Sequence, residues 1–459
     1  MASATILLPF YIHYLSTESF GVLFIYFAFS WLVQIIATFS FDSSIYVYYH
    51  EYKKDKHKLS IFISTAFLQV LLIGLALALL LLIIGSYVFQ LVFKNPLISF
   101  YPLGLMTVFT AIFQAIFKVF NSLLQTRQKP ERFLYSNLLS FSLIAGLTIL
   151  GLQIYPNSLI GPIGGRLLAA FISGGWALFN VLGEFGFHFN YPLLRSTLSF
   201  NFYTFIYQFQ QWLMNYFDRI LVSFFFFFSE VGIYGFTMSF MIVIEFIVNG
   251  INSSFTPKVV GMIVDQPEKK STPEINRYYY GLTAVTMIMV SFCILVFPVL
   301  IEHFVKKKEY QLAIQYIPYV ALIYLYRGTR AYFGIPYGIL KYTKPLPLIY
   351  LFVASIKIVG LILLIKYVGI YGVIAASLMS YLSEIILLYQ VGKDKFGFKF
   401  NTFKLVGAPT ALLITIASME LLIDNAYSNY LHLFYFVMCL GLLAFAFRKE
   451  TKLIIPFKI

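Results

Sequence analysis

Residues Gln211–Lys258 read QWLMNYFDRILVSFFFFFSEVGIYGFTMSFMIVIEFIVNGINSSFTPK and decide how the rest of the chain is interpreted. An acid–base dipeptide, Asp218–Arg219, lies inside an apolar run, where charge is costly. A polar turn that contains Glu230 and Gly232 then starts a second long apolar run. Runs of this length indicate membrane-spanning helices, because about 20 helical residues cross the roughly 30 Å hydrocarbon core of a bilayer.

The composition of the whole chain agrees with this interpretation. Of its 459 residues, 60% are apolar and 11% are charged, whereas soluble domains carry about 25% charged residues. The apolar runs are too long and too continuous for the alternating strands of a membrane barrel. The net charge of +14 is typical of basic cytoplasmic loops in a membrane protein and does not indicate nucleic-acid binding. The sequence therefore predicts an all-α polytopic membrane protein.

Hydropathy predicts fourteen spans, with the first too short to cross a bilayer alone. The predicted spans are residues 1–15, 20–45, 60–88, 98–125, 133–155, 160–183, 197–228, 231–256, 279–301, 311–339, 346–366, 370–391, 404–423 and 430–447.

Lysine and arginine side chains concentrate in the loops that follow even-numbered spans and in the C-terminal tail. The opposite loops hold few of them, apart from the cluster Lys306–Lys308. Because basic loops stay on the cytoplasmic side, this pattern predicts that both termini are cytoplasmic.

An internal repeat is visible between the two halves. Ser16–Val22 before the second span resembles Ser229–Ile233 before the eighth, and Gly161–Ser173 resembles Gly369–Ser380 at nearly the same separation. Chance recurrence of glycine-rich helix starts is the alternative. A repeat of six spans keeps the same orientation, so its halves are related by an axis along the membrane normal. We expect a lobe at residues 1–190, a second at 191–395, and two extra helices at 396–459.

Four segments carry a resemblance to a known family. They are Leu8–Gly21, the stretch from Asp218 to Tyr234, Pro257–Lys258, and Tyr367–Ala376. In order and spacing they resemble the polysaccharide and O-antigen lipid-linked oligosaccharide flippases of the multidrug/oligosaccharidyl-lipid/polysaccharide exporter superfamily. The short first span departs from that family, which normally has a full first helix.

The resemblance implies two six-helix lobes that rock about a central cavity by alternating access. It also implies a substrate, an undecaprenyl-pyrophosphate-linked repeat unit of an O-antigen, capsule or exopolysaccharide, moved from the inner to the outer leaflet. A bacterial inner membrane is the expected location. The expected partners are the lipid-linked glycan, membrane lipids and other polysaccharide assembly proteins.

Charged side chains within the spans are the candidate functional residues. Several charges at membrane depth are expected to face a cavity or one another rather than lipid. A cationic cavity would attract a pyrophosphate, since the planar guanidinium holds two phosphate oxygens at once. The alternative is that the acids neutralise nearby bases as structural pairs. The candidate cavity residues are Lys118, Arg166, Arg219, Arg327, Arg330 and Lys357, and the candidates for ion coupling or charge pairing are Asp218, Glu245 and Glu384.

A group of amides at the start of the second lobe is a weaker candidate. They are expected either to hydrogen-bond sugar hydroxyls or to hold helices together, and the sequence does not separate these roles. The group consists of Asn201, Gln208, Gln210, Gln211 and Asn215.

Motifs for other chemistry are absent from the sequence. There is no Walker A loop, and the six histidines lack metal-ligand spacing. We therefore expect a transporter and not an enzyme, with no cofactor or metal. H⁺ and Na⁺ are the candidate coupling ions, and the sequence does not decide whether either is used. An ion-coupled drug or small-molecule exporter of the same superfamily is one alternative, which favours a more acidic cavity. A membrane-embedded glycan polymerase is another, which needs a long outer loop with catalytic side chains.

Overall fold

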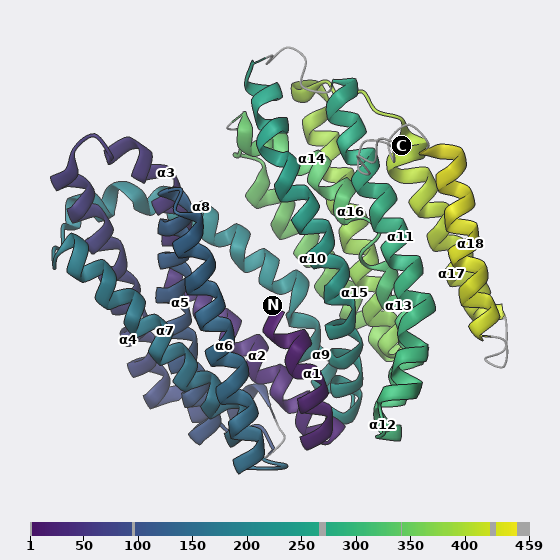
Figure 1. Cartoon of the computed structure of the whole chain (residues 1–459), viewed down its shortest axis with the longest axis horizontal. Coiled ribbons are helices and arrows are strands. Elements are labelled where there is room, and N and C mark those ends of the chain that lie inside the picture. Colours follow the sequence, from purple (N-terminus) through teal and green to yellow (C-terminus); the bar gives the residue numbers. More distant parts are fainter. Residues whose placement is uncertain (1, 94–96, 266–271, 341, 423–427, 448–459) are drawn as a thin grey trace. The chain divides into compact units, whose positions relative to one another are not determined.

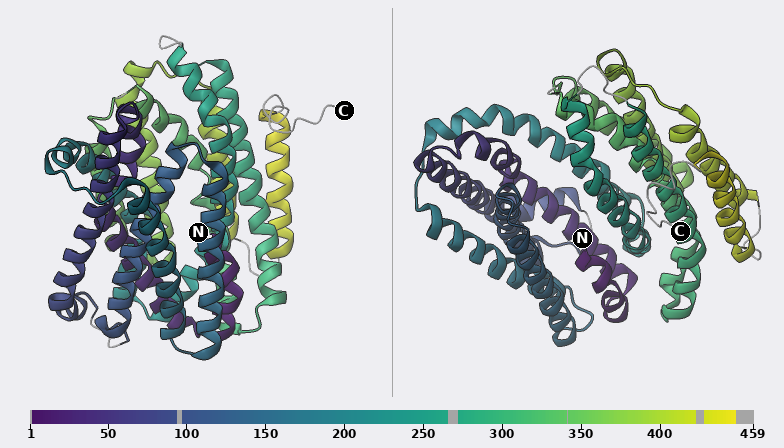
Figure 2. Two further views of the ribbon diagram at one scale, coloured as in Figure 1. Left: turned by 60° about the vertical axis from the view of Figure 1, so that its left-hand side comes forward. Right: turned by 45° about the horizontal axis from the view of Figure 1, so that its top comes forward.

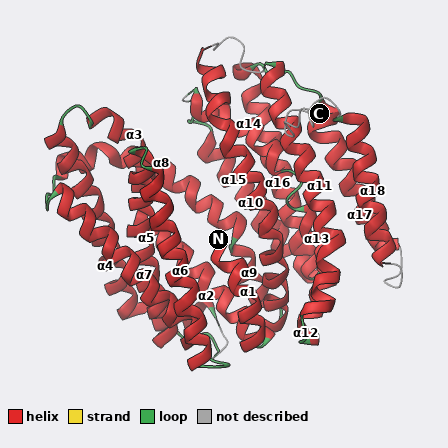
Figure 3. Cartoon of the chain, viewed as in Figure 1, coloured by secondary structure: helices red, strands yellow, loops and turns green. Residues whose placement is uncertain are grey.

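The computed structural model describes the chain except for residues 1, 94–96, 266–271, 341, 423–427 and 448–459. In this described part all regular secondary structure is helical (Figures 1 and 3). The helices form two compact units, residues 1–232 and 233–459, and each is described by itself.

The first unit contains nine α-helices, one π-helical turn and the first turn of a tenth helix among its described residues. The elements are α1 (Ala2–Tyr14), α2 (Thr17–Thr38), α3 (Phe41–Tyr52), α4 (Lys56–Val92), η1 (Phe100–Gly104), α5 (Leu105–Thr126), α6 (Pro130–Ile154), α7 (Ile160–Phe185), α8 (Tyr191–Asn215), α9 (Phe217–Phe225) and the start of α10 (Phe228–Asp265).

The core of the first unit lies where α2, α3, α4, α5 and α7 meet. Its buried side chains are almost all aliphatic or aromatic, such as Phe41, Ile63 and Val119. At one end of α5, Arg127 forms a two-bond ion pair with Glu184 of α7, with N–O distances of 2.8 and 2.5 Å. The hydrogen bonds to this carboxylate raise the pKa of Arg127, so the pair stays charged at physiological pH.

The second unit contains the rest of α10 and the remaining helices. They are α11 (Pro273–Phe304), α12 (Lys308–Gln311), η2 (Leu312–Tyr316), α13 (Ile317–Leu322), α14 (Arg327–Ile339), α15 (Leu346–Val368), α16 (Ile370–Phe396), η3 (Phe403–Gly407), α17 (Ala408–Leu422) and α18 (Ser428–Ala446). Within this unit α17 and α18 lie side by side at one edge (Figure 2), where α18 packs along α11 and α17 against α13.

The prediction of an all-helical polytopic protein is confirmed. Ten helices in the described residues are long and apolar enough to cross a membrane. The other predicted spans correspond to shorter or interrupted helices, namely α1, α8 with α9, α12 to α14, and α18. The proposed lobe boundaries at residues 190 and 395 stay predictions. In the structure α8 packs against α2, α3 and α4 and belongs to the first unit.

The glycines of the predicted repeat lie at close helix contacts. A Cβ at Gly161 of α7 would lie 2.2 Å from the carbonyl oxygen of Gly151 in α6, and one at Gly372 of α16 would lie 2.5 Å from that of Leu364 in α15. Both distances are too short for a side chain. Each half therefore contains a helical hairpin that closes on a glycine at the matching place, as the repeat predicts.

Candidate functional site

The second helix of the chain is broken, and the break creates a polar centre in the first unit. After Thr38 the backbone of Phe39 and Ser40 turns left-handed, with φ of 40° and 58°. The Thr38 hydroxyl donates to the Gln34 carbonyl at 2.6 Å, which occupies one carbonyl near the end of α2. The chain then resumes as α3, with Asp42 in its first turn.

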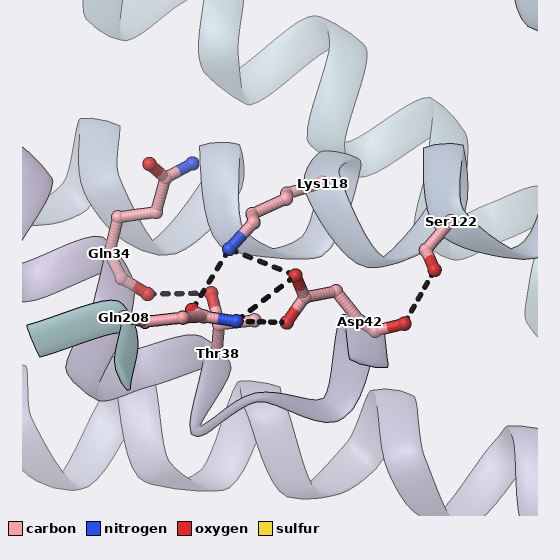
Figure 4. Close-up of polar contacts among 6 residues, drawn as sticks. All are labelled: Gln34, Thr38, Asp42, Lys118, Ser122 and Gln208. Carbon is pink, nitrogen blue, oxygen red and sulfur yellow. Dashed lines mark hydrogen bonds and ion pairs between the residues drawn. The ribbon is translucent and has the colours of Figure 1, made fainter. Parts of the chain in front are cut away.

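Asp42 joins three helices through its carboxylate (Figure 4). Lys118 of α5 lies 3.0 Å from Oδ2, and the Gln208 amide of α8 donates to both carboxylate oxygens at 3.2 and 3.3 Å. Lys118 also donates to the Gln208 carbonyl at 3.1 Å. On the backbone side the Ser122 hydroxyl donates to the Asp42 carbonyl at 2.5 Å. The Lys118 side chain remains 34% exposed, so this network is reachable from outside the helix core.

Helix α8 carries four of the five predicted amides along one face; Gln210 lies off that face, is buried and accepts a hydrogen bond from the Gln211 amide at 2.7 Å. Asn201, Thr204, Gln208, Gln211 and Asn215 recur at intervals of three and four residues, which places them on one side of a helix. Asn201 is fully buried and receives a hydrogen bond from Ser44 of α3. Asn201 and Gln208 have partners on other helices, so they link α8 to α3 and α5. A role of these amides toward sugar hydroxyls stays a prediction.

Two arginines of the first unit lie over aromatic rings of α2. The Arg166 guanidinium of α7 is 4.0 Å from the centre of the Phe27 ring, and that of Arg219 in α9 is 5.3 Å from the centre of the Phe24 ring. The electron-rich ring face attracts a cation. Within the described residues neither guanidinium has a carboxylate at ion-pair distance. Arg166 and Arg219 are therefore predicted cavity cations without a direct ion pair to a described carboxylate.

The Asp218–Arg219 dipeptide forms the start of α9, after a break at Tyr216. The Arg219 backbone N–H donates to the Asp218 carboxylate at 2.8 Å, and the Arg219 guanidinium donates to the Asn215 carbonyl at 3.1 Å. Both side chains are buried, and they are directed by adjacent backbone positions to different partners. The Asp218 carboxylate thus binds a backbone N–H in the first turn of α9. The Arg219 guanidinium lies against the rings of Phe24 and Tyr216.

In the second unit the predicted charges form ion pairs. Arg327 of α14 donates to Glu245 of α10 at 3.0 Å, and Arg330 donates to Glu384 of α16 at 2.7 Å. The Tyr381 ring lies beside both guanidiniums, 5.5 and 5.7 Å from its centre. This arrangement is the one expected of structural pairs. Lys357 is buried in α15, where it is 1% exposed.

The first turns of α2 and α10 approach each other as closely as two backbones can. A Cβ on Gly21 would lie 2.0 Å from the Phe228 carbonyl oxygen, and one on Gly232 would lie 2.0 Å from the Thr17 carbonyl oxygen. Each glycine thus meets the carbonyl four residues before the other. The contact is symmetric between the two copies of the repeat, so the Ser229–Gly232 turn serves helix packing.

Sequence analysis did not single out several residues that the structure places in the polar centre or beside the two arginines. Asp42 was overlooked although it is an acid within a long apolar segment, and that isolation was the available signal. The rings of Phe24 and Phe27 carried no signal beyond the many other phenylalanines. Among the described residues no group of three or more metal-ligating side chains comes together.

Comparison with known proteins places the chain in a family. A family model described as polysaccharide biosynthesis protein matches residues 3–262. The chain belongs to this family. The resemblance that the sequence motifs indicated is thereby confirmed, and no curated protein matches the chain in sequence.

Solved structures with a similar fold are transporters. A structure titled lipid II flippase MurJ, inward closed conformation, has a TM-score of 0.74 at 18% identity and covers 97% of this chain and 97% of its own. An inward-facing multidrug resistance MATE family transporter of the MOP superfamily has a TM-score of 0.68 at 13% identity, over 86% of this chain and 95% of its own. At these identities the likeness establishes the fold, which is that of a multi-pass membrane transporter or flippase.

Proposed function

We propose that this protein is a flippase that moves an undecaprenyl-pyrophosphate-linked oligosaccharide from the inner to the outer leaflet of a bacterial inner membrane by alternating access. The observation that carries the proposal is the match of the polysaccharide biosynthesis family to residues 3–262 in a chain with the fold of a lipid flippase. The cargo is the repeat unit of an O-antigen, capsule or exopolysaccharide. Both termini are cytoplasmic, in keeping with the basic loops.

Charge within the first unit supports an anionic cargo. Arg166 and Arg219 lack a carboxylate at ion-pair distance in the described residues and lie against aromatic rings instead. A guanidinium without an acidic partner has donors left for phosphate, and its fork matches two phosphate oxygens. By contrast, Arg327 and Arg330 already hold carboxylates. Of the predicted cavity residues, we therefore assign the pyrophosphate contacts first to Arg166 and Arg219.

An exporter of cationic drugs is a weaker proposal for the same fold. Such a cargo favours carboxylates that are not neutralised, whereas Asp42, Glu245 and Glu384 all have basic partners. No long outer loop of the kind a glycan polymerase needs is present in the described residues. Membrane lipids and other polysaccharide assembly proteins remain the proposed partners.

Deleting the gene in its host tests the function. We expect lipid-linked repeat units to accumulate on the cytoplasmic leaflet, where an impermeant glycan-labelling reagent reaches them only in inverted vesicles. Accumulation of single units on the outer leaflet would instead indicate a polymerase. Normal glycan export with lost drug resistance would indicate an exporter.

Removing either the Arg166 or the Arg219 charge is expected to impair export in the complemented deletion strain. Arg166→Gln and Arg219→Gln each remove a charge-assisted hydrogen bond worth about 1.5–3 kcal/mol, so we expect about ten- to hundred-fold weaker cargo binding. The measurement is the rate at which labelled repeat units reach the outer leaflet. Arg195→Gln is the matched control, because Arg195 is exposed near the start of α8. Full export in both variants, at equal protein level, would refute the assignment.

A further inference from the structure

Three acids within the helices face a lysine or an arginine. Asp42 faces Lys118 at 3.0 Å, Glu245 faces Arg327 at 3.0 Å, and Glu384 faces Arg330 at 2.7 Å. Protonating such an acid would cost it an ion pair in a poorly solvated site.

Glu420 is different because its partner can itself release a proton. The His432 Nε2 atom lies 3.3 Å from the Glu420 Oε1 atom, and within the described residues this carboxylate has no lysine or arginine at ion-pair distance. Histidine is the side chain whose charge changes between about pH 5 and 8. Glu420 is in the last turn of α17 and His432 near the start of α18, so the pair joins the ends of one hairpin.

The surroundings of the pair are closed and weakly polar. His432 is 2% exposed, and its second ring nitrogen, Nδ1, is buried with no hydrogen-bond partner in the described residues. Three tyrosines face the carboxylate: Tyr319 of α13, Tyr371 of α16 and Tyr435 of α18. The Tyr319 and Tyr371 rings contact each other at 5.0 Å between their centres. Among the described residues, the groups that face the carboxylate besides His432 are thus phenols.

We propose that Glu420 and His432 form a proton-binding site that joins α17 to α18 and stabilises their hairpin. With one proton, the pair is neutral overall, whether the proton resides on the imidazole or on the carboxylate. Without it, a single negative charge remains buried among phenols and apolar side chains, which is unfavourable. Helix α18 packs along α11, and α17 packs along α13. Loss of the proton therefore weakens the packing of the hairpin on these two helices. The site is independent of the flippase proposal.

The thermal stability of the purified full-length protein tests this site. The pair stabilises the protein while the proton is bound. This stabilisation is lost as the pH rises and the proton is released. Between pH 6 and 8.5 we expect the wild-type Tm to fall by about 3 °C more than that of Glu420→Gln or His432→Gln. The control is His303→Gln, since His303 is exposed at the end of α11, and it keeps the wild-type dependence.

A contact between Glu420 and His432 that binds no proton would give a different dependence of the Tm on pH. If the two variants lowered the Tm equally at every pH and kept the wild-type slope, the proposal would be wrong. Nitrogen NMR of labelled histidine in the intact protein provides a second measurement, which does not require the histidine variant to fold. We expect one of the six imidazole signals to depend on pH in the wild type and to change that dependence in Glu420→Gln. A spectrum in which Glu420→Gln alters no titrating signal would overturn the site.

Discussion

Glycan export is expected to collapse when Gly232 is replaced by alanine, although the protein still inserts and folds. The new Cβ would lie 2.0 Å from the Thr17 carbonyl oxygen, whereas carbon and oxygen need more than about 3 Å of separation. The first turns of α2 and α10 must then move apart by about 1 Å. Because protein interiors do not deform continuously, we expect the state with this contact closed to be lost and export to fall to about one tenth or less.

The symmetry of the contact sharpens this prediction. Gly21→Ala places its Cβ 2.0 Å from the Phe228 carbonyl oxygen, so it is expected to impair export as strongly as Gly232→Ala. Once one substitution has separated the two turns, the second has less to disrupt, and the double variant is expected to be little worse than either single one. The measurement is the outer-leaflet rate of labelled repeat units at matched protein levels.

A glycine of the same helix provides the control. Gly250 has no neighbouring atom near the position of a Cβ, so Gly250→Ala should leave export unchanged while improving helix propensity. Wild-type export in Gly21→Ala or Gly232→Ala would show that the transport cycle does not need the closed contact. Additive loss in the double variant would show that the two glycines act separately.

Glu384→Gln is expected to be the most damaging single change to stability in the second unit. The Glu384 side chain is 1% exposed and lies 2.7 Å from the Arg330 Nε. Removing one partner of a buried ion pair leaves the other charge poorly solvated, which typically costs about 3–5 kcal/mol. The measurement is the unfolding free energy of the purified protein, from denaturation in mixed micelles.

Replacing both partners distinguishes the effect of an unpaired charge from the effect of altered packing around the pair. Arg330→Met together with Glu384→Gln removes both charges, so we expect it to be less destabilising than Glu384→Gln alone. Lys258→Gln is the matched control, because the Lys258–Glu274 pair is largely exposed, at 60% and 54%, and is expected to contribute nothing measurable. A double variant at least as unstable as Glu384→Gln would show that the loss arises from packing rather than from an unpaired charge.

Much of the fold could be predicted from hydropathy. Long apolar runs and the repeated glycine turns indicate the positions of most helices and the close contacts between two pairs of them. The break at Phe39–Ser40 could not be predicted, since hydropathy does not report backbone direction. The predicted span at residues 311–339 is likewise divided into α12, η2, α13 and α14, and the apolar character continues across the divisions.

The charged residues could be located from the sequence, but their partners could not. Lys118 meets Asp42, and Arg327 meets Glu245, across distances in the chain that no local pattern encodes. The prediction of a cationic cavity therefore rests first on Arg166 and Arg219, because neither has a carboxylate at ion-pair distance in the described residues. His432 was noted only as lacking metal spacing, because its partner Glu420 lies on the preceding helix and two positions on different helices form no recognisable motif.

The rings beneath Arg166 and Arg219 have a consequence for energetics across the membrane. Phenylalanine attracts a guanidinium without cancelling its charge, so on the proposed function the empty carrier keeps cations that a pyrophosphate neutralises. The inside-negative membrane potential then acts on the empty carrier more than on the loaded one. One elementary charge is worth about 2.3 kcal/mol per 100 mV. The potential would therefore draw the emptied carrier back toward the cytoplasmic side and leave the outward step with cargo nearly indifferent to voltage.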